Sequence, residues 1–326
     1  MLFIRCLVAV LIAALALAAC GGDDTGASDD GGPTIAVTTN ILGDVVTSMV
    51  GDAARVVTVM PAGANPHEFQ ASARQVAAIQ KADLLIVNGD GFEEALLDVI
   101  ESAERDGVRV FEAVSAVEPL ERDHDEGDDH DKGDDHDGDD EAHDRDRHDH
   151  SAGDAHFFTD PARMADAARG ILAVLLELPD LDHDAVQARA EAYIAELEEL
   201  DREIEQILAA IPAGDRVLVT NHGVLDHFAH RYGFEVAGTV IPTGSTSGAS
   251  AADLARLADV MRSRDVRAVF TDASSSDNLA HTLADEVGDV AVVELFTESL
   301  GDADSGADTY LSMMRTNAHR IAEALS

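Results

Sequence analysis

The sequence of 326 residues lacks tryptophan, has only 4% aromatic residues and contains two cysteines. Both of these, Cys6 and Cys20, lie near the N-terminus, so neither a disulfide framework nor a cysteine-based zinc knuckle is expected in the rest of the chain. The shortage of aromatic residues argues against a carbohydrate-binding platform. Basic residues are also scarce: 22 stand against 64 acidic ones, which gives a net charge of −42. Such a surface repels phosphate backbones and concentrates cations, so we expect no nucleic-acid partner.

Signatures of catalysis are missing as well. The sequence contains neither a Gly-x-Ser-x-Gly nucleophile elbow nor the lysine of a phosphate-binding P-loop. His67 and Glu68 could begin the helix of a zinc hydrolase, but Ala71 stands where that motif requires its second histidine. We therefore expect a protein that is not an enzyme.

The N-terminus reads as a secretory signal. An apolar run from Cys6 to Ala19 follows the single charge of Arg5, and it is short for a stable membrane span. Its end, Leu17-Ala18-Ala19-Cys20, resembles the bacterial lipobox, which implies that Cys20 is lipidated; the alternative is an ordinary signal peptide with an incidental cysteine. Residues 21–33 read as a flexible tether. We expect an exported protein, lipid-anchored at the outer face of the cytoplasmic membrane, in the periplasm.

Extended apolar segments alternate with segments of helical periodicity through most of the remaining chain. This predicts an α/β fold of two Rossmann-like lobes with parallel sheets, an N-terminal lobe over 34–180 and a C-terminal lobe over 213–326. The predicted strands are Thr34–Thr39, Arg55–Met60, Asp83–Val87, Val108–Phe111, Arg216–Val219, Glu235–Val240, Ala268–Thr271 and Ala291–Leu295. The predicted helices are Ile41–Val50 (N-capped by Asn40), Ala71–Lys81, Phe92–Glu104, Pro161–Leu176, Val224–Tyr232, Ala249–Arg262, Asp277–Glu286 and Ala307–Leu325.

Between the lobes, Asp184–Ile211 runs without Gly or Pro for far longer than an ordinary helix. Its apolar residues recur at a spacing that suits either a coiled coil or a helix packed against both lobes. We favour the second interpretation and expect one long rigid helix over 181–212. A ligand shared by the lobes would then lie between them, beyond the carboxyl ends of their strands.

Residues 121–155 combine Asp, Glu and Gly with many histidines and almost no apolar side chain, which predicts a disordered loop. Imidazole is the commonest side-chain ligand of transition metals, and carboxylates attract a dication. One interpretation of the run is therefore auxiliary metal capture; the other is a solvating linker that happens to contain histidine. The histidines concerned are His124, His130, His136, His143, His148 and His150.

Three further histidines lie at equivalent places in loops of the predicted fold. His67 and His222 follow strands, and His156 precedes a helix at the end of the acidic run. A fourth ligand from the second lobe would complete a tetrahedral metal site, and the acidic candidates at strand ends are Asp272 and Glu298. The histidines within helical segments are interpreted as surface or packing residues: His227, His230, His281 and His319.

Short motifs around these positions resemble one known family. They are Asn65-Pro66-His67-Glu68-Phe69, His156 with Asp160-Pro161, Thr220-Asn221-His222-Gly223 with Tyr232-Gly233, Phe296–Leu300 and Asp308–Met314. From Ile35 to the C-terminus, apart from the acidic run, the chain is similar to the metal-binding receptors of ABC importers, in the group called cluster A-I or zinc-uptake substrate-binding proteins. The resemblance implies two lobes joined by a rigid helix, with a metal ion held between them.

The family's first three ligands fall on His67, His156 and His222, and its fourth on Glu298, with Asp272 as the alternative. Manganese-binding members carry a carboxylate at the position of His222, so the third imidazole favours Zn²⁺ over Mn²⁺. The resemblance also implies an ABC permease and an ATPase as partners, with a metallochaperone as a further candidate. We expect a monomeric, extracytoplasmic zinc receptor; a manganese receptor and a periplasmic zinc buffer or chaperone are the alternatives.

Overall fold

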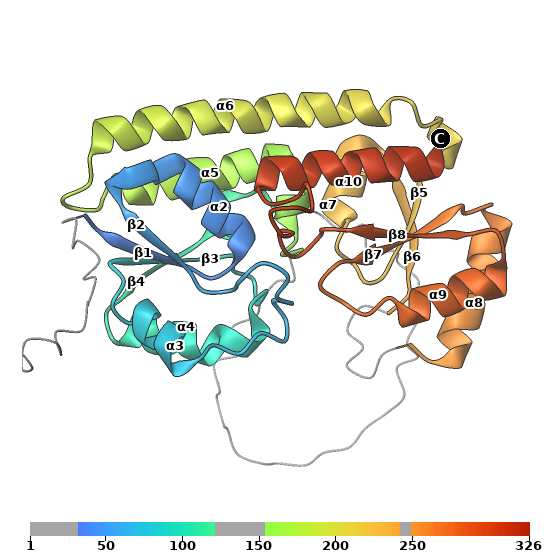
Figure 1. Ribbon diagram of the computed structural model, residues 1–326, viewed down its shortest axis with the longest axis horizontal. Coiled ribbons are helices and arrows are strands. Elements are labelled where there is room, and N and C mark those ends of the chain that lie inside the picture. The colour runs from blue at the N-terminus through green and yellow to red at the C-terminus, as the bar shows by residue number, and fades with distance from the viewer. Residues whose placement is uncertain (1–31, 121–153, 242–248) are drawn as a thin grey trace, which may run out of the picture. The chain divides into compact units, whose positions relative to one another are not determined.

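The computed structural model describes residues 32–120, 154–241 and 249–326, and residues 33–326 belong to one compact unit. Within this unit two lobes each contain a four-stranded parallel sheet with helices on both faces (Figure 1), which confirms the predicted fold class. The strand orders are β2-β1-β3-β4 and β6-β5-β7-β8. The strands are β1 Thr34–Val37, β2 Arg55–Thr58, β3 Leu84–Val87, β4 Arg109–Glu112, β5 Val217–Thr220, β6 Glu235–Thr239, β7 Ala268–Asp272 and β8 Ala291–Leu295.

The central strands form because their sequences are apolar over most of their length, with Thr or Asp only at their ends. All four residues of β3 (Leu-Leu-Ile-Val) are buried, and so is every residue of β5 and β7. A parallel strand covered on both faces requires such a continuous apolar run. The edge strands β2 (Arg-Val-Val-Thr) and β4 (Arg-Val-Phe-Glu) begin and end with polar residues, and none of their residues is fully buried.

The helices cover both faces of these sheets (Figure 1). On one side, α2, α5, α6, α7 and α10 share one hydrophobic core that extends through both lobes. A separate core lies under α3 and α4 in the N-terminal lobe, and another under α8 and α9 in the C-terminal lobe. The helices are α2 Asn40–Val50, α3 Ala73–Ile79, α4 Leu97–Arg105, α5 Pro161–Leu175, α6 His183–Leu208, α7 Asp226–Tyr232, α8 Ala251–Ser263, α9 Asn278–Val287 and α10 Tyr310–Leu325.

Helix α6 is the long element that runs beside both lobes (Figure 1). Its 26 residues span about 39 Å, and it packs against α2 and α5 of the N-terminal lobe and α10 of the C-terminal lobe. Asp182 caps it by accepting a hydrogen bond from the main-chain N–H of Ala185. Buried Asp201 also accepts hydrogen bonds from Arg231 and Tyr232 of α7, which ties α6 to the C-terminal lobe. Among the described residues, no helix combines the length and apolar character needed to cross a bilayer.

Several predicted helices begin later in the structure, the last of them at Tyr310 and not at Ala307. Two corrections at helix starts involve residues near the lobe interface. Thr39, not Asn40, caps α2, because its hydroxyl accepts from the main-chain N–H of Leu42 and frees Asn40 for other contacts. The predicted helix from Phe92 begins later, as a short 3-10 turn over Glu94–Leu96 that leads into α4. Phe92 itself is buried outside the helix.

The packing of α6 generates the first prediction. Replacing the fully buried Leu200 by Ala should lower the free energy of unfolding by about 2–5 kcal/mol, because it removes apolar contacts and leaves a cavity in the core shared by the lobes. Urea unfolding followed by circular dichroism measures this loss. Exposed Glu205 of the same helix is the control, since its replacement by Ala should change stability by no more than about 0.5 kcal/mol. Equal stabilities of the two variants would contradict this packing.

Candidate metal centre

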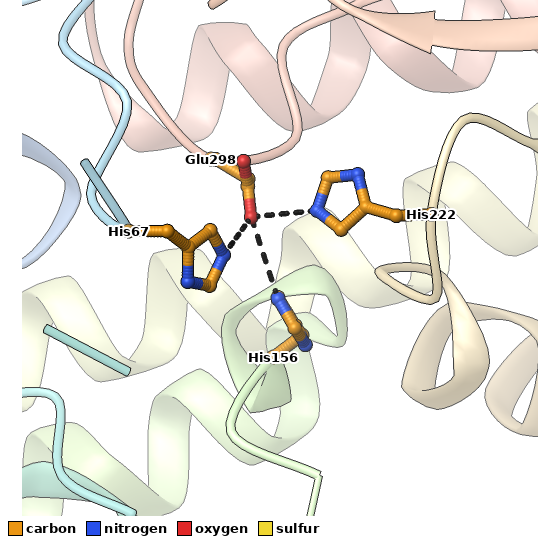
Figure 2. Close-up of side chains that lie close together, drawn as sticks. All are labelled: His67, His156, His222 and Glu298. Carbon is orange, nitrogen blue, oxygen red and sulfur yellow. Dashed lines mark hydrogen bonds and ion pairs between the residues drawn. The ribbon is translucent and has the colours of Figure 1, made fainter. Parts of the chain in front are cut away.

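Four side chains converge between the two lobes. The Nε2 atoms of His67 and His222 lie 2.7 and 2.8 Å from the Glu298 Oε1 atom. His156 Nε2 lies 3.5 Å from the same oxygen. Figure 2 shows the three imidazoles pointing at this carboxylate from different sides. One ligand atom from each residue can be chosen so that all four lie within 4.8 Å of one another.

The loops after β2 and β5 carry the first two of these imidazoles. His67 sits in the turn-rich loop after β2, where its main-chain N–H donates to the side-chain oxygen of Asn65 at 3.0 Å. His222 follows β5, and its carbonyl oxygen accepts a hydrogen bond from the Thr220 hydroxyl at 2.7 Å. Both rings are partly exposed, so an ion could reach them from solvent.

His156 is held by Asp154, and here the structure corrects the prediction. The expected disordered loop does not extend to residue 155, because Asp154 is only 5% exposed. Its Oδ1 atom lies 2.7 Å from His156 Nδ1 and accepts the main-chain N–H of His156 at 3.0 Å. The opposite ring nitrogen, Nε2, therefore faces Glu298. Sequence reasoning missed Asp154 because it stands at the end of a run of similar acidic residues; its place two residues before His156 is the only signal.

Glu298 supplies the carboxylate, whereas Asp272 holds it in place. Glu298 follows β8 and its side chain is fully buried. Asp272, the alternative ligand, ends β7 and lies outside the group of four. Its Oδ2 atom accepts hydrogen bonds from the main-chain N–H groups of Thr297 and Glu298 at 2.9 and 3.1 Å, and from the Thr297 hydroxyl at 2.6 Å. The carboxylate of Asp272 thus fixes the loop that presents Glu298.

Asn40 connects two loops of opposite lobes. Its side-chain amide donates to the Pro61 carbonyl at 2.8 Å and to the Ser299 hydroxyl at 2.9 Å, and its oxygen accepts from the main-chain N–H of Leu300 at 2.8 Å. The Ser299 hydroxyl also accepts from the main-chain N–H of Gly63 at 2.7 Å. The loop that carries His67 and the loop that carries Glu298 are thus joined by hydrogen bonds across the lobe interface.

Two phenylalanines form an apolar wall beside the imidazoles. The Phe92 ring makes edge-on contacts with His67 and His156, at centroid distances of 5.2 and 5.4 Å. Phe158 contacts His156 in the same manner at 5.9 Å. Both phenylalanines are buried. A wall of this kind limits water access on one side of the cluster and strengthens its electrostatic interactions.

The pKa values of Glu298 and His156 are shifted because a buried carboxylate lies among imidazole rings. Burial alone would raise the pKa of Glu298, but the facing rings of His156, His222 and His67 hold that pKa well below its usual range. Burial alone would lower the pKa of His156, whereas the carboxylates of Asp154 and Glu298 raise it to about 9. The metal-free site therefore holds an ionised carboxylate beside a protonated imidazole.

The donor set suits a transition-metal dication. The Nε2 atom of His156 and the Oε2 atom of Glu298 are buried without a hydrogen-bond partner among the described residues. Nitrogen and oxygen donors of this kind bind zinc at about 2.0–2.2 Å, in tetrahedral geometry. The structure thus brings together His67, His156, His222 and Glu298 in an arrangement that a single ion could bridge.

Other predicted site residues lie outside the described residues or away from the cluster. Cys20 and the six histidines of the acidic run fall in the first category. Of the helical histidines, His227 is buried, and the remainder are exposed: His230, His281 and His319.

Comparisons with known proteins identify similar chains. The family model described as zinc-uptake complex component A, periplasmic, matches residues 35–324. The manganese-binding lipoprotein MntA of Halalkalibacterium halodurans is 28% identical over 319 residues, which cover 97% of each chain. The zinc-binding protein TroA of Treponema pallidum is 28% identical over 306 residues, which cover 92% of this chain and 91% of that protein. The solved structure of the Treponema protein matches with a TM-score of 0.77 at 25% identity, over 91% of this chain and 100% of that one.

The raised pKa of His156 predicts the pH dependence of metal binding. A dication must displace the proton on His156 Nε2, so its affinity should rise from pH 6 to about pH 9, by up to about tenfold per pH unit from this residue alone. Calorimetric zinc titrations in buffers of different ionisation enthalpy count the protons released. An affinity independent of pH over this range, with no proton release, would contradict the assigned protonation state.

Proposed function

The chain belongs to the zinc-uptake complex component A family, whose members are metal-binding receptors of ABC importers, and from this we propose that it binds zinc outside the cytoplasm and delivers it to an importer. The observation that carries the proposal is the convergence of three imidazoles and one buried carboxylate from two lobes. An ABC permease and its ATPase would be the partners that take up the ion.

The choice of zinc depends on the donors. Three imidazole nitrogens and a single carboxylate suit tetrahedral zinc, whereas manganese prefers a shell richer in oxygen. The relatives support both ions, since one is named for manganese and another for zinc. A manganese receptor is therefore the second candidate, and a direct comparison of the two affinities separates them.

The same donor set supports transport rather than catalysis. A catalytic zinc keeps a coordination position open for water and has a general base beside it. Here the three imidazoles and Glu298 would together complete a tetrahedral shell. The Phe92 and Phe158 rings also close one side of the site. A closed shell selects the ion and retains it until the importer draws the ligands apart.

We also propose roles for two parts of the sequence outside the described residues. Cys20 would carry the lipid anchor, which is supported by the lipobox-like Leu17-Ala18-Ala19-Cys20 and by relatives named as lipoproteins. The histidines of residues 121–153 would bind zinc weakly and raise its concentration near His156, which lies only three residues beyond this run.

Replacing His222 by Ala should weaken zinc binding by more than about 100-fold, because the loss of a direct ligand should exceed the 10–100-fold typical of a supporting residue. Competition with a chelating dye measures the dissociation constant. His230→Ala, on the exposed face of nearby α7, should bind zinc as the unaltered protein does. An unchanged affinity in the His222 variant would remove this residue from the ligand set.

Deleting residues 123–153 should abolish weak additional zinc binding and leave the tight site intact. The deletion keeps Asp154, whose contact with His156 belongs to the site. Isothermal calorimetry on the soluble protein from residue 33 onward separates the two classes of site by their stoichiometry. Disappearance of the tight site in the deletion variant would show that the acidic run contributes ligands to it.

A further inference from the structure

Asp154 contacts His156 twice with one carboxylate oxygen. This Oδ1 atom accepts the main-chain N–H of His156 at 3.0 Å and lies 2.7 Å from the ring atom Nδ1. A carboxylate at this distance requires a proton on Nδ1, which leaves Nε2 as the ring atom able to donate a lone pair to an ion. Residues that support a metal-binding histidine in this way fix both its tautomer and the orientation of its ring.

The position of Asp154 is in turn fixed from the opposite lobe. His227, in α7 of the C-terminal lobe, is 1% exposed and lies with its Nε2 atom 2.9 Å from the carbonyl oxygen of Asp154. Since a carbonyl can only accept, Nε2 of His227 carries the proton. From the N-terminal lobe, the side-chain amide of Asn88 donates to the carbonyl of Ala155 at 2.9 Å. The segment 154–156 is thus held from both sides, by one side chain from each lobe.

We infer that Asp154 is a positioning residue for metal binding, which aims Nε2 of His156 at the ion, and that His227 holds Asp154 in place from the second lobe. The inference depends on the proposed function, because it assigns roles at the same site. His227 follows the ligand candidate His222 by five residues, so one stretch of the C-terminal lobe both provides a ligand and supports a ligand of the other lobe. Displacing this stretch would disturb two imidazoles together.

Four variants and one control test the two roles. Asp154→Ala removes the acceptor and should weaken zinc binding by about 10–100-fold. Asp154→Asn keeps an oxygen acceptor for the Nδ1–H group of His156, so its zinc affinity should fall less than that of Asp154→Ala. His227→Phe removes the donor to the Asp154 carbonyl and should weaken binding, whereas His227→Gln retains an amide donor and should restore much of the affinity. Asp166→Ala, on the exposed face of α5, should leave binding unchanged.

Nitrogen-15 NMR spectra of the zinc-loaded protein provide a second measurement, because a loss of stability alone would not change the signal of the His156 ring. The Nδ1–H signal of His156 should be present in the unaltered protein and should be shifted or exchange-broadened in Asp154→Ala. Melting curves of the metal-free variants control for folding, and the nearly isosteric Asp154→Asn keeps the test decisive if Asp154→Ala does not fold.

The outcomes separate this inference from the proposed function. The positioning role is overturned, and the receptor function stands, if both Asp154 variants bind zinc as tightly as the unaltered protein does and leave the His156 signal unchanged. Weaker binding that only parallels a loss of metal-free stability, with the same His156 signal, would also overturn it. Failure of the unaltered protein to bind zinc would overturn the proposed function, and this inference with it.

Discussion

A buried carboxylate needs polar partners, and Glu298 obtains them from three imidazoles that belong to three separate loops. An ionised group removed from water without such partners is strongly destabilising. In the metal-free protein, the protonated imidazole of His156 provides part of this compensation. A dication can replace that proton, because it interacts with the same carboxylate and with the ring nitrogens at once. The cluster is therefore held together with or without the ion, and metal binding becomes an exchange of a proton for a metal ion.

This exchange requires the lobes to keep a fixed separation, because His67 and His156 belong to one lobe and His222 and Glu298 to the other. Three features of the fold provide it. One hydrophobic core extends through both lobes, α6 packs against helices of each, and Asn40 joins the loops around Pro61 and Leu300. Because this packing does not depend on the metal, we expect release in the proposed function to need only a small local displacement of the loops that carry His67, His156, His222 and Glu298. A large hinge motion of whole lobes would have to break this shared core.

Much of this arrangement could be predicted from the sequence, for identifiable reasons. Continuous apolar strands such as Leu84–Val87 and the uninterrupted helix now seen over His183–Leu208 specify two α/β lobes and their connection. The three histidines stand out because they follow strands or precede a helix at the same edge of the sheets. The choice between Asp272 and Glu298 could not be made from local pattern, since both lie at the carboxyl ends of strands; the direction of each side chain depends on tertiary hydrogen bonds. For Asn40 the local rule of helix capping predicts a role that its long-range contacts do not follow. For Asp154 the acidic composition of the neighbouring run likewise predicts disorder, whereas its contacts with His156 and His227 hold it in place.

The central claim is that one ion is shared by three imidazoles and one carboxylate from both lobes. X-ray absorption at the zinc edge of the purified protein, loaded with one equivalent of zinc, tests it most directly. We predict a four-coordinate shell of three imidazole nitrogens and one oxygen at about 2.0–2.2 Å. A six-coordinate shell dominated by oxygen, or a shell with fewer than three imidazoles, would contradict it.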